Sequence, residues 1–396
     1  MTSPLAGIRI LDFTRYQQGP FATVMLGDMG AEVIKIEETT IGDYGRRVWR
    51  ERDGFSAFWE SLNRGKKSVC IDLRTDAGRE LALKLGETSD VVMENFRPGT
   101  MEGWGLGYDD FRARNPRIIY GQATGWGTKG PMAGLPSFDQ IAQAFSGYAQ
   151  QCGGGIGTRP EVPFPGVADQ TGAMNFAFGI LTALFVRERT GVGQKVDVSL
   201  LGTQLALQAP ALLHALHFGQ ERAREFRASP TTGQYECADG RWVMIVGIDQ
   251  KFWPRIANAL QVPHLIEDPR FATGHPRYVN KDELESLLEQ AFRACPSAYW
   301  LDRLREHDVP ASLVRNYAEV AGDEQIAMNG YIVEQENARF GPQKVVGLHV
   351  QLSETPGEVG APAPGLGEHT FSILRSAGID DRRLAELAEA GVIRGS

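Results

Sequence analysis

The first half of the chain alternates short apolar runs, typical of buried β-strands, with segments that have the periodicity of helices. The runs that we interpret as strands are residues 8–13, 32–37, 69–73, 90–94, 117–121 and 195–200. A helical segment follows most of them, such as 21–29, which Gly30 ends. Strands joined in this way by helices form a mainly parallel sheet with right-handed crossovers. The pattern therefore predicts a Rossmann-like, doubly wound α/β domain.

A change in composition after about residue 225 predicts a second, smaller domain. Residues 201–225 have a helical pattern and are interpreted as a linking helix. An Asp239-Gly240 pair between two apolar runs then predicts a β-hairpin, with helices to follow. We expect a large α/β domain at 1–200, completed by 326–396, and a small α+β domain at 226–325. The stretch 356–367, rich in Pro and Gly, is predicted to form an extended strap.

The overall composition argues against several classes of protein. The 396 residues carry a net charge of −8, whereas proteins that bind nucleic acid usually present a basic patch. The start of the chain lacks a signal peptide pattern, and the most apolar helical segment, 173–186, is too short to span a membrane. The four cysteines are scattered without a CxxC pair, as in a reducing compartment. We therefore expect a cytoplasmic protein that binds neither nucleic acid nor membranes.

Asp169 is the acidic residue whose position most clearly suggests a chemical role. It follows a loop rich in Gly and Pro and begins a long apolar helical segment that ends near Gly191. On pattern alone the simpler interpretation is an N-cap, in which the carboxylate bonds the free N–H groups of the helix. The other interpretation is a carboxylate nucleophile that forms covalent acyl intermediates, and a helix start favours the ionised form that a nucleophile needs. The residues leave both open.

Other polar groups follow the predicted strands, at the edge where parallel sheets bind their ligands. Gln17 lies in the first strand-to-helix loop, and its amide can stabilise an oxyanion near an acyl carbonyl. Basic residues at 64–67, Arg74 and Arg97 can contact phosphates through charge-assisted hydrogen bonds. The loop 14–20 has one glycine where a dinucleotide fingerprint needs three, so NAD binding is not predicted.

Two further clusters have both a functional and a structural interpretation. His214, His217 and Glu221 share one face of the linking helix, an arrangement that is more typical of packing than of a metal site. Arginines follow the Gly-Asp turn at 42–43, and their cations would suit a dicarboxylate such as succinate. A solvated surface turn explains them equally well. The residues of this second cluster are Arg46, Arg47, Trp49 and Arg50.

An ordered series of motifs runs nearly from end to end of the chain. Its segments are 4–13, 19–20, 26–37, 63–68, 94–99, 105–108, 190–199, 309–311 and 366–370. Together they resemble the class III coenzyme A transferase family, which includes the formyl-CoA:oxalate and carnitine CoA-transferases. The resemblance implies an enzyme that moves CoA between small carboxylic acids, as an interlocked homodimer of ring-like chains. It implies CoA thioesters as substrates, no tightly bound cofactor and no metal.

The resemblance also implies roles for individual residues. A catalytic aspartate of the family matches Asp169, which would attack an acyl-CoA to give a mixed anhydride and then an aspartyl-CoA thioester. Gln17 matches a glutamine near the reaction centre. The positions that match the family's CoA-binding residues are Tyr16, Ile71, Asp72, Leu73, Arg74, Asn95, Phe96 and Arg97.

The chain departs from the family's pattern at several positions. The formyl-CoA transferase branch has a run of glycines before the small domain, but residues 228–234 have none. Arg15 replaces a histidine and Phe138 a tyrosine of that branch, so oxalate is not assigned as the acceptor. The Gly-rich segment 153–157 is a candidate for oxyanion stabilisation or for a lid.

Two alternatives to a transferase stay open. One is an acyl-CoA racemase or isomerase on the same fold. Residues 136–139 argue against it, because they lack the histidine that would exchange a proton at the α-carbon. The other is a protein that binds acyl-CoA without catalysis.

Overall fold

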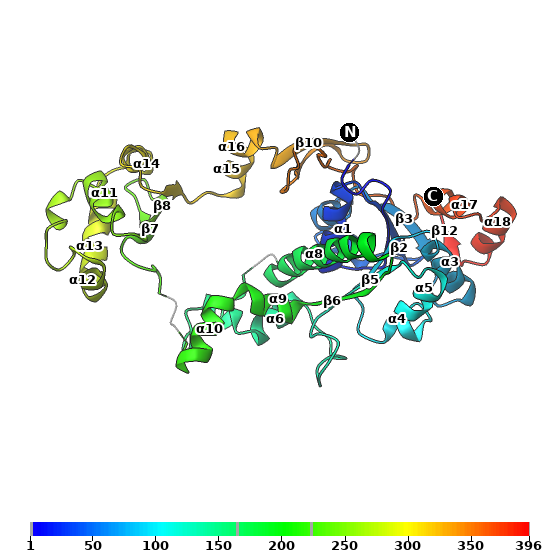
Figure 1. Cartoon of the computed structure of the whole chain (residues 1–396). Helices are drawn as coiled ribbons and strands as arrows, with labels where there is room; N and C mark the ends of the chain where they lie inside the picture. Colours follow the sequence, from blue (N-terminus) through cyan, green and yellow to red (C-terminus); the bar gives the residue numbers. More distant parts are fainter. Residues whose placement is uncertain (1–2, 164–165, 222–224, 396) are drawn as a thin grey trace. The chain divides into compact units, whose positions relative to one another are not determined.

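The computed structural model describes residues 3–163, 166–221 and 225–395, and the chain divides into two compact units (Figure 1). Unit 1 comprises residues 1–152, 160–222 and 325–396, and unit 2 comprises 153–159 and 223–324. Each unit has a hydrophobic core of its own. Among the helices of the described ranges, none combines the length and the apolar composition that a membrane span requires.

Unit 1 is built on a seven-stranded sheet with the order β12-β3-β2-β1-β4-β5-β6. The strands are β1 (Arg9–Asp12), β2 (Glu32–Glu37), β3 (Lys67–Ile71), β4 (Val91–Glu94), β5 (Ile119–Thr124), β6 (Lys195–Ser199) and β12 (Ile393–Arg394). All neighbours pair in parallel except β12, which lies antiparallel to β3. The order from β3 to β6 is that of a doubly wound sheet. The predicted parallel α/β sheet is confirmed.

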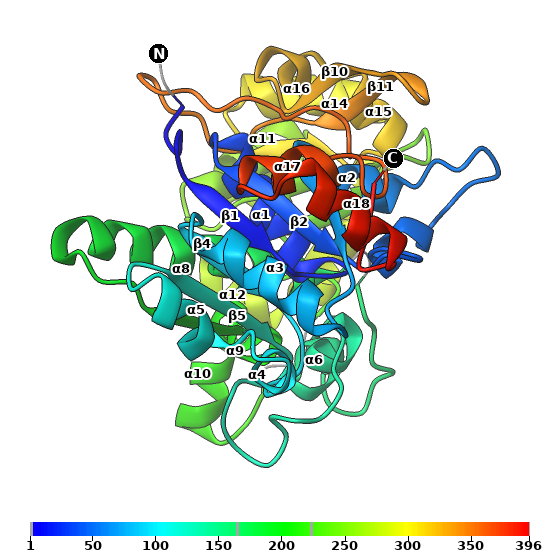
Figure 2. The same cartoon turned by 90° about the vertical axis from the view of Figure 1, so that its right-hand side faces the viewer.

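Helices cover both faces of this sheet because successive strand residues point to opposite sides. Ile10 packs with α1 (Gln18–Asp28) and α8 (Val167–Thr190). The next residue, Leu11, packs on the other face with α3, α5, α17 and α18. Figure 1 shows the two layers on either side of the strands, and Figure 2 looks onto the second face. The bounds of these four helices are α3 (Asp76–Gly86), α5 (Tyr108–Arg114), α17 (Thr370–Ser376) and α18 (Asp381–Glu389).

Shorter elements complete unit 1. They are η1 (Tyr44–Arg47), α2 (Ala57–Asn63), α4 (Thr100–Gly103), α6 (Asp139–Phe145), α7 (Tyr148–Cys152), β10 (Ile332–Asn337) and β11 (Gly341–Val346), with α16 (Glu324–Met328) at the boundary. The predicted strap 356–367 contains neither helix nor strand and is hydrogen-bonded to the rest of the unit. Its contacts include hydrogen bonds from the N–H of Glu358 to the carbonyl of Asp28 at 2.8 Å and from the N–H of Gly367 to Ser68 Oγ at 2.9 Å.

The predicted linking helix is wrong as a single helix. Its described part forms α9 (Leu200–Leu207) and α10 (Ala209–Phe218), which meet at Gln208. Pro210 explains the break, because it has no N–H to donate to the carbonyl of Ala206 and its ring clashes with that carbonyl. Residues 222–224 of the predicted helix lie outside the described part of the chain.

Unit 2 combines an antiparallel sheet with helices. The expected hairpin is present, with Asp239 and Gly240 in its turn and Gly240 at a φ of 71°. Trp253, Phe292 and Trp300 are buried in the core. The elements are β7 (Thr232–Glu236), β8 (Trp242–Val246), β9 (Ala311–Leu313), α11 (Phe252–Ala259), η2 (Pro263–Leu265), α12 (Gly274–Val279), α13 (Lys281–Phe292), α14 (Ser297–Glu306) and α15 (Tyr317–Ala321).

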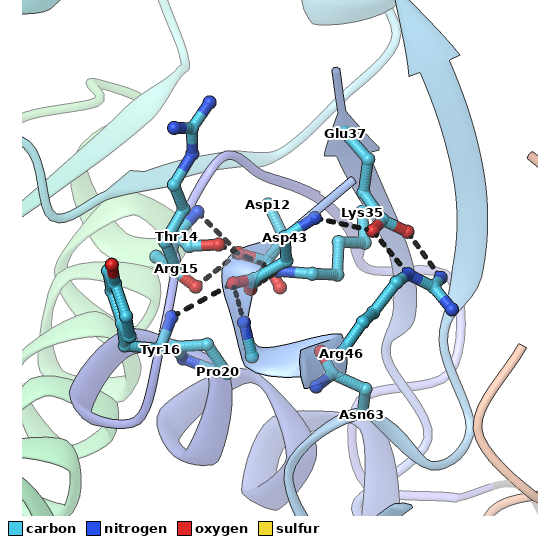
Figure 3. Close-up of polar contacts among 12 residues, drawn as sticks. Asp12, Thr14, Arg15, Tyr16, Pro20, Lys35, Glu37, Asp43, Arg46 and Asn63 are labelled. Atoms are coloured by element: carbon cyan, nitrogen blue, oxygen red, sulfur yellow. Dashed lines mark hydrogen bonds and ion pairs between the residues drawn. The ribbon is translucent and has the colours of Figure 1, made fainter. Parts of the chain in front are cut away.

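A buried charge cluster lies beneath the loop that follows β1 (Figure 3). Asp12 accepts hydrogen bonds from the backbone N–H and the hydroxyl of Thr14, at 2.8 and 2.6 Å, and lies 3.1 Å from Lys66 Nζ. Lys35 Nζ donates to the carbonyl of Thr14 at 2.7 Å and lies 2.9 Å from Asp43 Oδ2. Burial opposes the ionisation of Asp12, yet the charges of Lys66 and Lys35 lower its pKa to about 2. Asp12 is therefore ionised at neutral pH.

We expect Lys66→Met to lower the free energy of unfolding by about 3 kcal/mol, because it leaves the buried Asp12 carboxylate without its nearest cation. Lys67→Met is a matched control, since that neighbouring lysine is 43% exposed and its partner Glu32 is also paired with Arg9. It should lose less than about 1 kcal/mol. Urea unfolding measures both, and equal losses would show that the cluster contributes no more than a surface pair.

Candidate active site

A cavity of about 270 Å³ lies in unit 1 at the carboxyl ends of the strands. Segments that follow β1, β4 and β5 line it, together with the start of α8. In doubly wound sheets a ligand binds where the strand order reverses, which is here between β1 and β4. The predicted site residues that the cavity brings together are Tyr16, Gln17, Asn95, Phe96, Arg97 and Asp169.

Asp169 is the third residue of α8, and its interpretation as the N-cap is wrong. The N-cap is Gly166, and the free N–H groups of Ala168 and Asp169 donate to Oδ1 of Asp139 in α6, at 2.7 and 3.0 Å. Asp139 therefore caps α8 from outside the helix. Within the described parts of the chain, no donor is bonded to the Asp169 carboxylate, which is left available for a ligand in the cavity.

The protein around the cavity changes the ionisation of Asp169. Burial, and then the negative charge of Asp139, raises its pKa to about 7. The prediction that the helix start favours the ionised form is therefore wrong, because Asp139 already occupies the N–H groups and adds a second negative charge. A carboxylate with this pKa is still half ionised at neutral pH, and it is a stronger base than an ordinary aspartate.

The side chain of Gln17 lies against Gly166, the residue at which α8 begins. A Cβ atom at that glycine would come within 2.5 Å of Gln17 Nε2 and 3.0 Å of its Oε1. The glycine also has a φ of 76°, a conformation that L residues rarely adopt. Both observations explain why glycine is required here for an amide to approach the start of α8.

Neighbouring loops hold the backbone of the Gln17 loop in place. Asn95 accepts from the N–H of Arg15 at 2.7 Å and donates to its carbonyl at 2.8 Å. The N–H of Tyr16 donates to Asp43 Oδ1 at 3.3 Å, as Figure 3 shows. Tyr16 has a φ of 62°, which is unfavourable for a tyrosine. Contacts from two other loops thus maintain a strained conformation beside the cavity.

Aromatic rings and cations form the rest of the wall. The Tyr16 ring packs edge-on against Phe138, at 5.8 Å between ring centroids. The Arg15 guanidinium lies 4.9 Å from the centre of the Phe96 ring, and Arg97 is exposed. Arg15 and Arg97 form no ion pair with a carboxylate in the ranges that the structure describes. Both can accept an anionic group of a ligand.

The predicted CoA-binding residues after β3 do not line this cavity. Ile71 is fully buried, and Asp72 forms two hydrogen bonds of 2.8 Å with the exposed Arg74. Leu73 packs against the core of the sheet. Strand β3 lies three positions from β4, a distance of about 14 Å at the usual strand spacing. The assignment of these residues stays a prediction.

Glu94, which closes β4, is a residue of the site that was not predicted from the sequence. Its two oxygens accept from the amide of Gln122 and from the N–H of Phe96, both at 2.6 Å. Burial raises the pKa of Glu94 to about 8. Glu94 thus orients the loop that carries Asn95 and Phe96. The available signal was an acidic residue at the end of an otherwise apolar strand.

The candidate metal site of His214, His217 and Glu221 is not supported by its contacts. His214 and His217 pack against Phe218, at 4.7 and 4.6 Å between ring centroids, and Glu221 accepts a hydrogen bond from Gln151. Throughout the described residues, no group of three His, Cys, Asp or Glu side chains is placed to hold a metal ion. The Gly-rich segment 153–157 belongs to unit 2, and its role stays a prediction.

The arginines after β2 line a second cavity of about 520 Å³ in unit 1, which shares no residue with the first. Arg46 is held by Glu37 through hydrogen bonds of 2.8 and 2.7 Å, and it lies 3.7 Å from the centre of the Trp59 ring. Arg47 and Arg50 also line this cavity. Within one chain, these three arginines do not line the cavity of Asp169.

The model of CoA-transferase family III matches residues 5–370 of the chain. The chain belongs to this family. It is 34% identical to the succinyl-CoA:glutarate CoA-transferase of Homo sapiens, over 98% of this chain and 90% of that protein. It is 33% identical to the acetyl-CoA:oxalate CoA-transferase of Acetobacter aceti, over 94% of this chain and 95% of that protein.

A solved structure also resembles the chain in fold. The crystal structure of Rv3272 from Mycobacterium tuberculosis has a TM-score of 0.84 and 32% identity, and it covers 94% of this chain and 99% of that one. The similarity extends over the sequence ranges of both units.

We expect the Asp169 carboxyl to titrate near pH 7, as followed by carbon NMR of labelled aspartate with Asp169→Asn to assign the signal. Asp139→Asn keeps an oxygen for the N–H groups of α8 and removes one negative charge. It should therefore lower the pKa of Asp169 part of the way toward the ordinary value of 3.8. The folded state holds the proton more tightly than the unfolded chain. The Asp169 contribution to stability therefore falls as the pH rises from 3.8 to about 7. A midpoint near 4 would refute the raised pKa.

Proposed function

We propose that this family III CoA-transferase moves CoA from an acyl-CoA donor to a small dicarboxylic acid, with Asp169 as the covalent nucleophile. The observation that carries the proposal is a carboxylate without a hydrogen-bond donor at the wall of a cavity that also contains an amide and two free cations. A capping aspartate would be bonded to its helix, and Asp139 has that role instead.

The proposed reaction has four transfers at Asp169. Its carboxylate attacks the thioester carbon, the C–S bond breaks and CoA leaves as the thiolate, which gives a mixed anhydride. The thiolate attacks the aspartyl carbonyl and releases the donor acid, which leaves an aspartyl-CoA thioester. The acceptor carboxylate attacks that thioester and expels the thiolate again. The thiolate then attacks the acceptor's acyl carbon, and free Asp169 is regenerated.

The carboxyl edge of the sheet supports a path for CoA. The reacting thioester would lie in the cavity, with Arg15 and Arg97 near the anionic parts of the substrate. The rest of CoA would run along the edge toward Asp72 and Arg74, about 14 Å away. Arg74 is exposed, and surface pairs such as Arg74–Asp72 are weak, so a phosphate can compete for its guanidinium.

A dicarboxylate acceptor is supported by charge and by the relatives. The two relatives above are named for glutarate and oxalate, which are both dicarboxylates. One carboxylate of the acceptor would react at Asp169, and the other needs a cation. Arg15 is the cavity cation nearest in sequence to Gln17, and it has no carboxylate partner in the described structure. A neutral monocarboxylate would leave this cation unused.

A homodimer is part of the proposal, and an apolar stripe on α8 supports it. Met174, Phe178, Leu181 and Phe185 recur along one face of the helix and are 49%, 69%, 41% and 57% exposed. Large apolar side chains in such a row usually mark a protein interface. We assign the stripe to a second copy of this chain, because the resemblance to the family implies a homodimer.

The alternatives make different predictions. A racemase or isomerase would exchange solvent deuterium into the α-position of an acyl-CoA without any acceptor acid. A binding protein would hold CoA equally well after Asp169→Asn and would form no adduct. Residues 136–139, which lack the racemase histidine, support the transferase. Asp139 of that segment accepts hydrogen bonds from the N–H groups at the start of α8.

We expect succinyl-CoA to give a covalent adduct on Asp169 that borohydride or hydroxylamine traps and intact mass detects. Asp169→Asn should abolish the adduct, because an amide is a poor nucleophile. Asp197→Asn is a control carboxylate in β6 that is 47% exposed and should keep the adduct. Wild-type protein that binds CoA but forms no adduct with acetyl-CoA or succinyl-CoA would refute covalent catalysis.

We expect Phe178→Asp to shift the protein toward monomers in sedimentation velocity, because it places a charge within the apolar stripe. Arg189→Asp is the control: Arg189 lies beside Phe185 at the end of α8, and its replacement should shift the protein less toward monomers. A wild-type monomer at micromolar concentration would contradict the assigned homodimer.

A further inference from the structure

We propose that Gln18 is a second amide that contacts the reacting carbonyl at Asp169, in addition to Gln17. The inference rests on the proposed function. It assigns to the neighbour of Gln17 a direct contact with the acyl group while that group is bound to Asp169.

Gln18 is a buried amide without a partner. It is the first residue of α1 and is 4% exposed, and its Nε2 has no hydrogen-bond partner among the described residues. A buried polar atom left unpaired costs about 1–3 kcal/mol. An apolar side chain of similar size would avoid that cost, so fold stability does not explain a glutamine here.

The amide lies beside the helix face that carries Asp169. A Cβ atom at Gly172 would come within 2.7 Å of Gln18 Nε2 and 3.2 Å of its Cδ. Gly172 is three residues after Asp169 in α8, and residues with that spacing are neighbours on one helix face. Gln18 also lines the cavity of Asp169. Its amide is thus about one helical turn from the nucleophile.

Gln17 and Gln18 together flank the nucleophile. Gln17 lies against Gly166, three residues before Asp169, and Gln18 lies against Gly172, three residues after it. Each glycine leaves the space that the amide occupies. Two consecutive residues, Gln17 in the loop after β1 and Gln18 at the start of α1, therefore place their amides against α8 on either side of Asp169 along the helix. The buried charge cluster bonds the backbone of Thr14 in that loop.

This arrangement suits the charge that develops during acyl transfer. As the Asp169 oxygen bonds to the thioester carbon, the carbonyl oxygen becomes negative, before the C–S bond breaks and the thiolate leaves. Amide N–H groups that face this oxygen stabilise it. Gln18 gives up no hydrogen bond when it turns its N–H₂ group toward the substrate, because that group has none in the free protein.

The test is the single-turnover rate of adduct formation with saturating succinyl-CoA, for wild type, Gln17→Leu, Gln18→Leu and the double variant. Loss of one oxyanion donor slows such reactions by about 10²-fold, so Gln18→Leu should lose about that much in rate with little change in KM. The double variant should lose less than the product of the two single losses if both amides contact one oxygen. The melting temperature of Gln18→Leu should be equal to or above that of wild type.

Gln204→Leu is the matched control. Gln204 is also fully buried, packs near α8 through Thr171 and has an unpartnered atom, but it does not line the cavity. It should leave the rate unchanged. Gln18→Met serves if the Leu variant does not fold, and Gln18→Asn tests whether a shorter amide restores part of the rate.

The outcomes separate the inference from the proposed function. An adduct formed by Gln18→Leu at the wild-type rate, or equal losses in Gln18→Leu and Gln204→Leu, would overturn the role of Gln18 and leave Asp169 as the nucleophile. No adduct on wild-type protein would overturn the proposed function itself.

Discussion

The buried ion cluster of Asp12, Lys35, Lys66 and Asp43 is the interaction on which the site depends. It joins the carboxyl ends of β1 and β2 to the segment that begins β3, and it bonds the backbone of Thr14 and Tyr16. Buried ion pairs contribute little net stability compared with apolar packing, and they require specific geometry. Their effect here is to fix a strained loop, so that its side chains face one cavity.

The sheet could be predicted from the sequence because strand and helix periodicities are local properties of the chain. Runs such as 32–37 coincide with β2, and the order of motifs identified the family. The break between α9 and α10 was not predicted, because the apolar pattern continues across Pro210. The proline itself was the signal that the helix is interrupted there. The candidate nucleophile was identified by resemblance, whereas its ionisation depends on Asp139, which is distant in sequence and adjacent in space.

Two aspartates near the start of α8 have separate roles, one in capping the helix and one in lining the cavity. Asp139, in the neighbouring helix α6, accepts hydrogen bonds from the N–H groups at the start of α8. Asp169 therefore does not cap the helix. It lines the cavity, where burial and the charge of Asp139 raise its pKa to about 7. These separate roles could not be predicted from the sequence, because a carboxylate three residues into a helix and one at its cap look alike in a single sequence. The same limit applies to Glu94, whose burial is a property of the assembled sheet.

The hydrogen bonds that anchor the loop of Gln17, residues 14–20, affect the order in which the protein folds. Its hydrogen bonds come from residues 27 and 80 positions away, Asp43 to Tyr16 and Asn95 to Arg15. The loop can reach its final shape only after β2 and β4 have both docked against β1. A nascent or partly unfolded chain therefore lacks an ordered candidate site, and the proposed nucleophile is not placed in its cavity until the core of the sheet has closed.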